Sequence, residues 1–203
     1  MIYLILKKIL FIFLFLTASL AYGNIDDSNR IEILVNENII TKYDITQRLK
    51  INAILNRMEI NENNYNILLN AVIDDLIVEK LKIKKIKEYS ISFDKYEFDQ
   101  HEHRFISSMS HDKENLKQLF LNNDINYNYL REFVEIDLQW QKLIYGLYLR
   151  VSSVTDQEIS NLISKNPDLS REAASDLLLQ KQLDLKSIKL INDLRDEATI
   201  EYK

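Results

Sequence analysis

Apolar residues recur at steps of three and four along most of the chain, which is the spacing that lines one face of an α-helix. The pattern predicts seven helices, over about residues 41–57, 65–88, 92–109, 110–122, 126–151, 155–166 and 170–196. Several of their starts carry side chains that cap helices, namely Thr41, Ser92, Ser110 or Asp112, Asn126 and Thr155. A mainly helical protein is therefore expected.

The same spacing identifies the face of each helix that should point inward. For the first and second helices these residues are Ile45, Leu49, Ala53, Ile54, Tyr65, Leu68, Leu69, Val72, Ile73, Leu76, Ile77 and Leu81. For the long fifth helix they are Tyr129, Phe133, Ile136, Trp140, Leu143, Leu147 and Val151, and for the last helix Ala174, Leu177, Leu178, Leu185, Ile188 and Ile191.

Strand patterns are found only near the two ends of the chain. Residues 31–35 and 39–40 are short apolar runs around a turn in which Asn36 or Asn38 can take the left-handed conformation, so they predict a hairpin. Residues 198–202 alternate apolar and polar side chains and are too short to be stable alone. We therefore expect the C-terminal strand to pair with the N-terminal hairpin in one small antiparallel sheet.

Composition supports a helical protein without nucleotide chemistry. The chain holds two glycines, Gly23 and Gly146, one proline, Pro167, and no cysteine. Tight sheet turns, phosphate-binding loops and nucleophile elbows all need glycine, so most nucleotide-dependent enzymes are excluded. Without cysteine there are no disulfides, and stability must come from packing.

Residues 1–23 are expected to be a cleaved export signal. Lys7 and Lys8 precede an apolar run at 9–20, and small residues follow at 21–23. The alternative is an uncleaved anchor in the inner membrane. Cleavage would leave 24 basic residues (26 minus 2) against 31 acidic ones, a net charge of −7 that attracts neither nucleic acid nor anionic lipid. Residues 24–203 are then expected to form a single domain, in which 167–203 complete the part built by 31–166.

Few side chains suggest chemistry. His101 and His103 are two apart on a predicted helix and point in different directions, so they and His111 are expected to be exposed and to bind no metal. Pairs of neighbouring carboxylates lie on the polar faces of the predicted helices, so we expect them to be solvated surface groups without a catalytic role. Five aromatic residues off the main apolar stripes, Tyr96, Phe98, Tyr127, Tyr145 and Tyr148, are candidates for a groove that binds extended polypeptide, although ordinary packing explains them equally well.

Four parts of the chain, in order, resemble the SurA family of periplasmic chaperones: residues 33–45 (ILVNENIITKYDI), residues 125–131 and 138–144 of one predicted helix (INYNYLR and LQWQKLI), residues 151–159 (VSSVTDQEI) and residues 191–201 (INDLRDEATIE). The resemblance implies a SurA- or trigger-factor-type helical chaperone domain. It also implies binding of unfolded outer-membrane proteins in the periplasm through apolar grooves, without ATP or another cofactor.

One departure from the family changes the expected activity. Only nine residues lie between Ile163 and Ala173, where relatives carry parvulin domains, so prolyl-isomerase activity is not carried over. Two alternatives to a chaperone stay open: a peptidyl-prolyl isomerase by family label, and an assembly subunit with one fixed partner or with itself.

Overall fold

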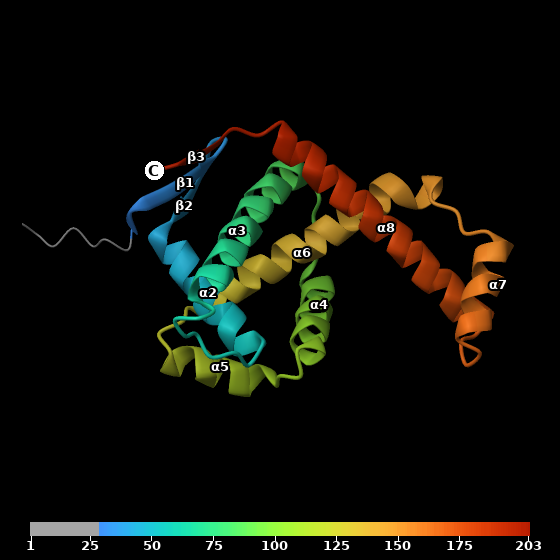
Figure 1. Cartoon of the computed structure of the whole chain (residues 1–203), viewed down its shortest axis with the longest axis horizontal. Helices are drawn as coiled ribbons and strands as arrows, with labels where there is room; N and C mark the ends of the chain where they lie inside the picture. The colour runs from blue at the N-terminus through green and yellow to red at the C-terminus, as the bar shows by residue number, and fades with distance from the viewer. Residues whose placement is uncertain (1–28) are drawn as a thin grey trace, which may run out of the picture.

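The structure is a computed structural model that describes residues 29–203, so the expected leader at 1–23 lies outside the described residues. Its elements run in the order β1 (Ile31–Val35), β2 (Asn38–Thr41), α2 (Lys42–Leu55), α3 (Tyr65–Glu88), α4 (Lys95–Ser108), α5 (Lys113–Asn122), α6 (Tyr127–Tyr148), a 3₁₀ turn (Leu149–Val151), α7 (Asp156–Lys165), α8 (Arg171–Asp196) and β3 (Ile200–Tyr202). The predicted fold class, mainly helical with one small sheet, is confirmed (Figure 1). In residues 29–203, no helix is both long and apolar enough to cross a membrane.

The sheet joins the two ends of the described chain. Its strand order is β2-β1-β3, with both pairs antiparallel, and Val35 of β1 lies opposite Ile200 of β3. Asn36 takes the expected left-handed conformation in the hairpin turn, with φ of 52°. Its side-chain oxygen accepts a hydrogen bond from the Thr199 backbone N–H at 3.0 Å. The predicted pairing of the C-terminal strand with the N-terminal hairpin is therefore confirmed.

Helices α2 and α3 pack beneath this sheet. Thr41 caps α2 in a capping box with Asp44, as the sequence predicts. Arg48 of α2 forms a buried ion pair with Glu79 of α3, and its guanidinium lies 4.7 Å from the centre of the Phe133 ring. Apolar residues from the three elements form one core cluster: Ile33, Val35, Ile40, Ile45, Leu49, Val72, Leu76, Ile77 and Leu81.

A second cluster lies between α2, α4, α5 and α6. Its fully buried members include Leu116, Phe120, Leu130 and Val134. The predicted start of α4 at Ser92 is wrong, because Asp94 caps this helix in a box with Glu97. An aspartate side chain accepts the N-terminal N–H groups as well as a serine does, and only Asp94 has a glutamate three residues later that closes the box.

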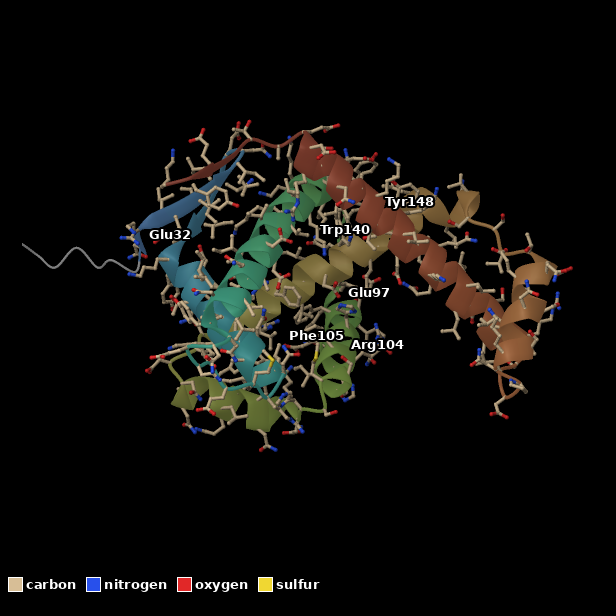
Figure 2. The ribbon with its side chains drawn as sticks, in the orientation of Figure 1. Glu32, Glu97, Arg104, Phe105, Trp140 and Tyr148 are labelled. Atoms are coloured by element: carbon tan, nitrogen blue, oxygen red, sulfur yellow. The ribbon has the colours of Figure 1, made fainter. Side chains whose placement is uncertain are left out.

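The third cluster holds α8 against α3 and α6. Trp140 lies between α6 and α8 (Figure 2). Its indole N–H donates to the Ser187 hydroxyl at 2.8 Å, and Leu183 of the same cluster is buried. Toward its N-terminus α8 packs on α7, and Figure 1 shows this helix pair extending away from the rest of the molecule. The predicted inward positions Leu177, Leu185 and Ile188 are exposed, which is a correction to the sequence analysis.

Candidate functional site

The five aromatic residues suggested by the sequence do not line one groove. Tyr96 is exposed on α4, Tyr145 is half-exposed on α6, and Tyr148 packs partly buried beside the third cluster. Phe98 is only 2% exposed, so its ring is packed inside the protein and is not offered at the surface. The reason is its helix face, which turns the ring into the core beside Phe93 and beneath the guanidinium of Arg131.

Tyr127 belongs to a polar cluster in the interior. Its hydroxyl donates to Glu102 at 3.0 Å, and Glu102, which is 1% exposed, is also paired with Lys113 and Arg131. Burial, and then the negative charge of Glu102, raises the pKa of the Tyr127 phenol above its ordinary value. The phenol therefore stays protonated and acts as a fixed hydrogen-bond donor, which ties α6 to α4.

Tyr145 lines a cavity of about 390 Å³ between α4 and α6, together with Arg104, Lys142 and Gly146. At its rim Lys142 donates to both carboxylate oxygens of Glu97 at 2.8 Å, and this bond holds the pKa of Glu97 below its usual value. Gly146 leaves open space, since a methyl group at its Cα would meet no neighbouring atom within 4 Å. Tyr145 is therefore placed at a hollow in the surface.

His101, also at this cavity, corrects another expectation. Its ring nitrogen Nε2 lies 2.9 Å from a carboxylate oxygen of Asp137, and the residue is 6% exposed. A histidine can be buried in this way when a carboxylate on the facing helix supplies a partner. In residues 29–203, no group of three or more histidine or carboxylate side chains is placed to hold a metal ion.

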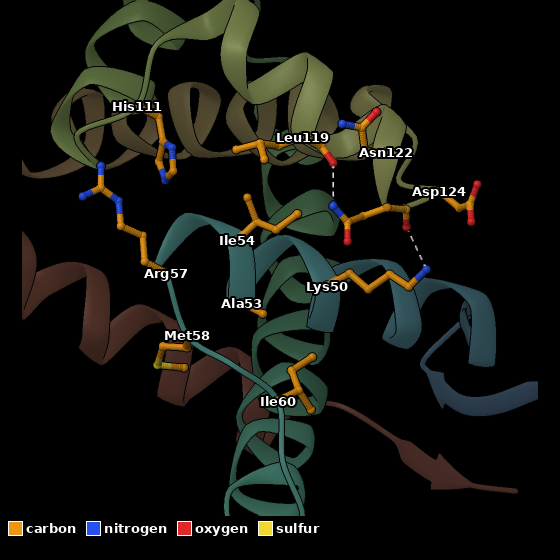
Figure 3. A pocket seen from close by; sticks show the side chains of 11 residues that line it. Lys50, Ala53, Ile54, Arg57, Met58, Ile60, His111, Leu119, Asn122 and Asp124 are labelled. Atoms are coloured by element: carbon orange, nitrogen blue, oxygen red, sulfur yellow. Dashed lines mark hydrogen bonds between the residues drawn. The ribbon is translucent and has the colours of Figure 1, made fainter.

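A larger open cavity, of about 780 Å³, lies between the C-terminal half of α2, the loop after it, and α5 (Figure 3). We call it the α2–α5 groove. Its apolar lining residues are Ala53, Ile54, Met58, Ile60 and Leu119, and its polar ones are Lys50, Arg57, His111, Asn122, Asn123 and Asp124. Met58 and Leu119 are each about two-fifths exposed, so apolar surface is accessible from solvent.

The groove is built where three helices end. Helices α2, α4 and α5 are each followed by a residue in the left-handed conformation, Arg57, Ser110 and Asp124, with φ between 53° and 57°. In each case the next residue bonds back across the last turn; Met58 N–H, for example, donates to Ala53 at 2.8 Å. This is the Schellman arrangement, which usually places glycine at the left-handed position.

Each of these helix ends also receives a side chain from a neighbouring segment. Arg57 donates to the Ser110 carbonyl at 2.7 Å, Lys50 donates to the Asn123 carbonyl at 3.0 Å, and His111 Nε2 lies 3.2 Å from the Leu55 carbonyl. Cationic side chains are favoured at helix C-termini, where carbonyl groups lack intrahelical partners and carry partial negative charge. These contacts fix the walls of the groove relative to one another.

Sequence reasoning missed the groove because its lining residues come from helix ends and loops, not from an apolar stripe. The available signals were the polar gap at 59–64, the apolar residue Met58 just before it and Ile60 within it. None of these signals reveals that α5 closes over the end of α2. That arrangement depends on contacts between residues far apart in the sequence, such as Arg57 with Ser110, 53 positions apart, and Lys50 with Asn123, 73 positions apart.

Fold and site together define a helical domain closed by a terminal sheet and carrying an open groove with an apolar floor. No protein-family model matches the chain, and no curated protein matches it. Among solved structures it is similar to a chain from the work on PEB4 and the periplasmic protein Cj1289, two structurally related SurA-like chaperones of the human pathogen Campylobacter jejuni.

The match to that structure covers 86% of this chain and 99% of the other, at 16% sequence identity and a TM-score of 0.46. The expected resemblance to SurA-like proteins is thus found among solved structures.

Proposed function

We propose that the protein is an ATP-independent chaperone that holds unfolded, exported polypeptides, outer-membrane proteins among them, in the periplasm. The observation that supports this function is the α2–α5 groove, which offers an apolar floor to solvent between walls fixed by hydrogen bonds. Soluble domains usually keep their large apolar side chains from gathering at an accessible hollow, and such hollows mark binding sites. The expected cleavable leader at 1–23 supports export.

Reversible burial of apolar side chains would be the mechanism. Burial contributes about 25 cal/mol per Å² of apolar surface, and much of this is offset by the ordering of an unfolded client. The groove is open rather than enclosed, so a bound segment stays partly solvated and leaves again without an energy source. Binding of this kind requires no catalytic residue, and we propose that the protein is not an enzyme.

The decisive experiment measures light scattering while an unfolded outer-membrane barrel protein is diluted out of denaturant. The full chain, in molar excess, is expected to suppress aggregation of the client without ATP. Replacement of Leu119, which lines the groove, by serine should weaken suppression several-fold. Leu121 lies two residues away on α5, is more exposed and is not part of the lining, so Leu121→Ser is the matched control.

Three results would contradict the proposal. Aggregation that proceeds unchanged in the presence of excess protein would exclude the holdase function. Acceleration of proline-peptide isomerisation above background would identify an enzyme instead. Co-purification of one partner at fixed stoichiometry, without effect on unfolded clients, would indicate an assembly subunit.

A further inference from the structure

The α2–α5 groove combines its apolar floor with positive charge in a protein that is acidic overall. The whole chain has a formal net charge of −5. The groove, in contrast, is lined by the basic residues Lys50 and Arg57, and among the described residues that line it Asp124 is the one acid. Figure 3 shows Arg57 and His111 at one end and Lys50 at the other, with Ile54 and Leu119 between them.

These cations keep unused hydrogen-bonding capacity. Arg57 and Lys50 each donate to one backbone carbonyl, and in residues 29–203 neither forms an ion pair with a carboxylate. A guanidinium carries five N–H donors and an ammonium three, so most remain for a ligand. A carboxylate is the group that such donors bind most strongly, because the hydrogen bond is assisted by charge on both sides.

We infer that the α2–α5 groove selects extended polypeptide segments that carry an acidic side chain next to apolar ones. The apolar side chains would lie over Ile54 and Leu119, and the carboxylate would face Arg57 at the end of the groove. This inference rests on the proposed chaperone function and adds to it the class of client segment that the groove prefers. Because the protein is negatively charged overall, its long-range field repels acidic peptides. The preference for an acidic side chain must therefore come from short-range contacts inside the groove.

The test uses labelled peptides that are identical except at one central position, which holds glutamate, glutamine or lysine among leucines. Fluorescence anisotropy with the full, unmodified chain should show the tightest binding for the glutamate peptide and the weakest for the lysine peptide. We expect the dissociation constants of the glutamate and lysine peptides to differ by roughly threefold to tenfold. This is the effect expected when a partly exposed ion pair is replaced by two like charges. The preference should shrink as salt is added.

Charge reversal assigns the preference to the groove. Arg57→Glu should invert the order, so that the lysine peptide binds best. Lys186 lies exposed on α8 and outside the groove, and Lys186→Glu changes the net charge by the same amount, so this control should keep the original order. If Arg57→Glu fails to fold, as judged by circular dichroism, Arg57→Gln removes the charge at the same position and should abolish the preference for the glutamate peptide over the glutamine peptide.

Three outcomes overturn the inference. Equal affinities for the three peptides, or an order that Arg57→Glu leaves unchanged, would show that the groove does not recognise carboxylates. Dimerisation of the chain that Arg57→Glu abolishes, without peptide binding, would assign the groove to a second copy. In each case suppression of aggregation by the unmodified chain would leave the chaperone proposal standing, whereas loss of suppression would remove it separately.

Discussion

At the scale of single residues, the shortage of glycine shapes how the helices end. Four helices are followed by left-handed residues that are not glycine: Arg57, Ser90, Ser110 and Asp124. A residue with a Cβ atom in this conformation costs about 1–2 kcal/mol relative to its usual right-handed state. The hydrogen bonds across the last turn, such as that from the Ile91 N–H to Ile86 at 3.3 Å, offset this cost.

Ser90→Gly is therefore expected to stabilise the protein. Glycine adopts the left-handed conformation without steric cost, although its freer unfolded state cancels part of the gain, so the expected increase in the free energy of unfolding is about 0.5–1 kcal/mol. Ser175→Gly, inside α8, is the control and should destabilise by about 0.5 kcal/mol, the difference between the helix propensities of serine and glycine. Urea denaturation measures both; a loss of stability in Ser90→Gly would contradict the account.

The sequence predicted the left-handed residue in the hairpin but not those after the helices. Asn36 sits between two short strand patterns, and asparagine tolerates this conformation, so the turn was readable. Ser90 and Ser110 are ordinary polar residues, and their conformation depends on where the preceding helix stops. Helix ends are fixed by packing and capping together, which a single sequence determines only to within a few residues.

At the scale of elements, α8 shows why a single apolar stripe can mislead. The helix packs on α7 near its start and on α3 and α6 near its end, so its buried face changes along its length. One constant apolar face would place Leu185 inside, whereas Leu185 is exposed and Leu183 is buried. Helix α3 has one continuous buried face, and its predicted residues from Val72 to Leu81 are buried or partly buried.

A pair of leucines on α8 tests this assignment. Leu183→Ala should lower the free energy of unfolding by about 2–4 kcal/mol, because it leaves a cavity beside Trp140, Leu143 and Ile144. Leu185→Ala, at a position 58% exposed, should change it by less than about 0.5 kcal/mol. Trp140 is the one tryptophan of the chain and reports both unfolding transitions by fluorescence. A larger loss of stability in Leu185→Ala than in Leu183→Ala would show instead that α8 buries one constant face along its length.

At the scale of the whole molecule, the meeting of the two chain ends was predictable and the α2–α5 groove was not. The final segment alternates apolar and polar residues, which predicts a strand, and the only other strand pattern lies in the hairpin. The hairpin was therefore the only pairing partner that the sequence offered to the C-terminal strand. The groove depends instead on how α5 lies across the end of α2, which is set by distant contacts that leave no periodic signal.

The register of the closing strand gives a test of that arrangement. Antiparallel strands alternate hydrogen-bonded and non-bonded pairs, and the bond from Lys203 N–H to Glu32 at 2.9 Å fixes the phase. Glu201, opposite Leu34, then donates its N–H into the ladder, whereas the N–H of Tyr202 points to the open edge.

Proline fixes φ and removes the backbone N–H wherever it is placed. Proline substitutions at positions 201 and 202 therefore differ mainly in whether the lost N–H belonged to the ladder. Glu201→Pro is expected to destabilise the protein by about 1 kcal/mol more than Tyr202→Pro, the net worth of a ladder hydrogen bond. Guanidinium denaturation followed by circular dichroism measures the difference. Equal effects would mean that β3 does not hold the chain ends together, and α8 would then be retained by its contacts with α3 and α6 alone.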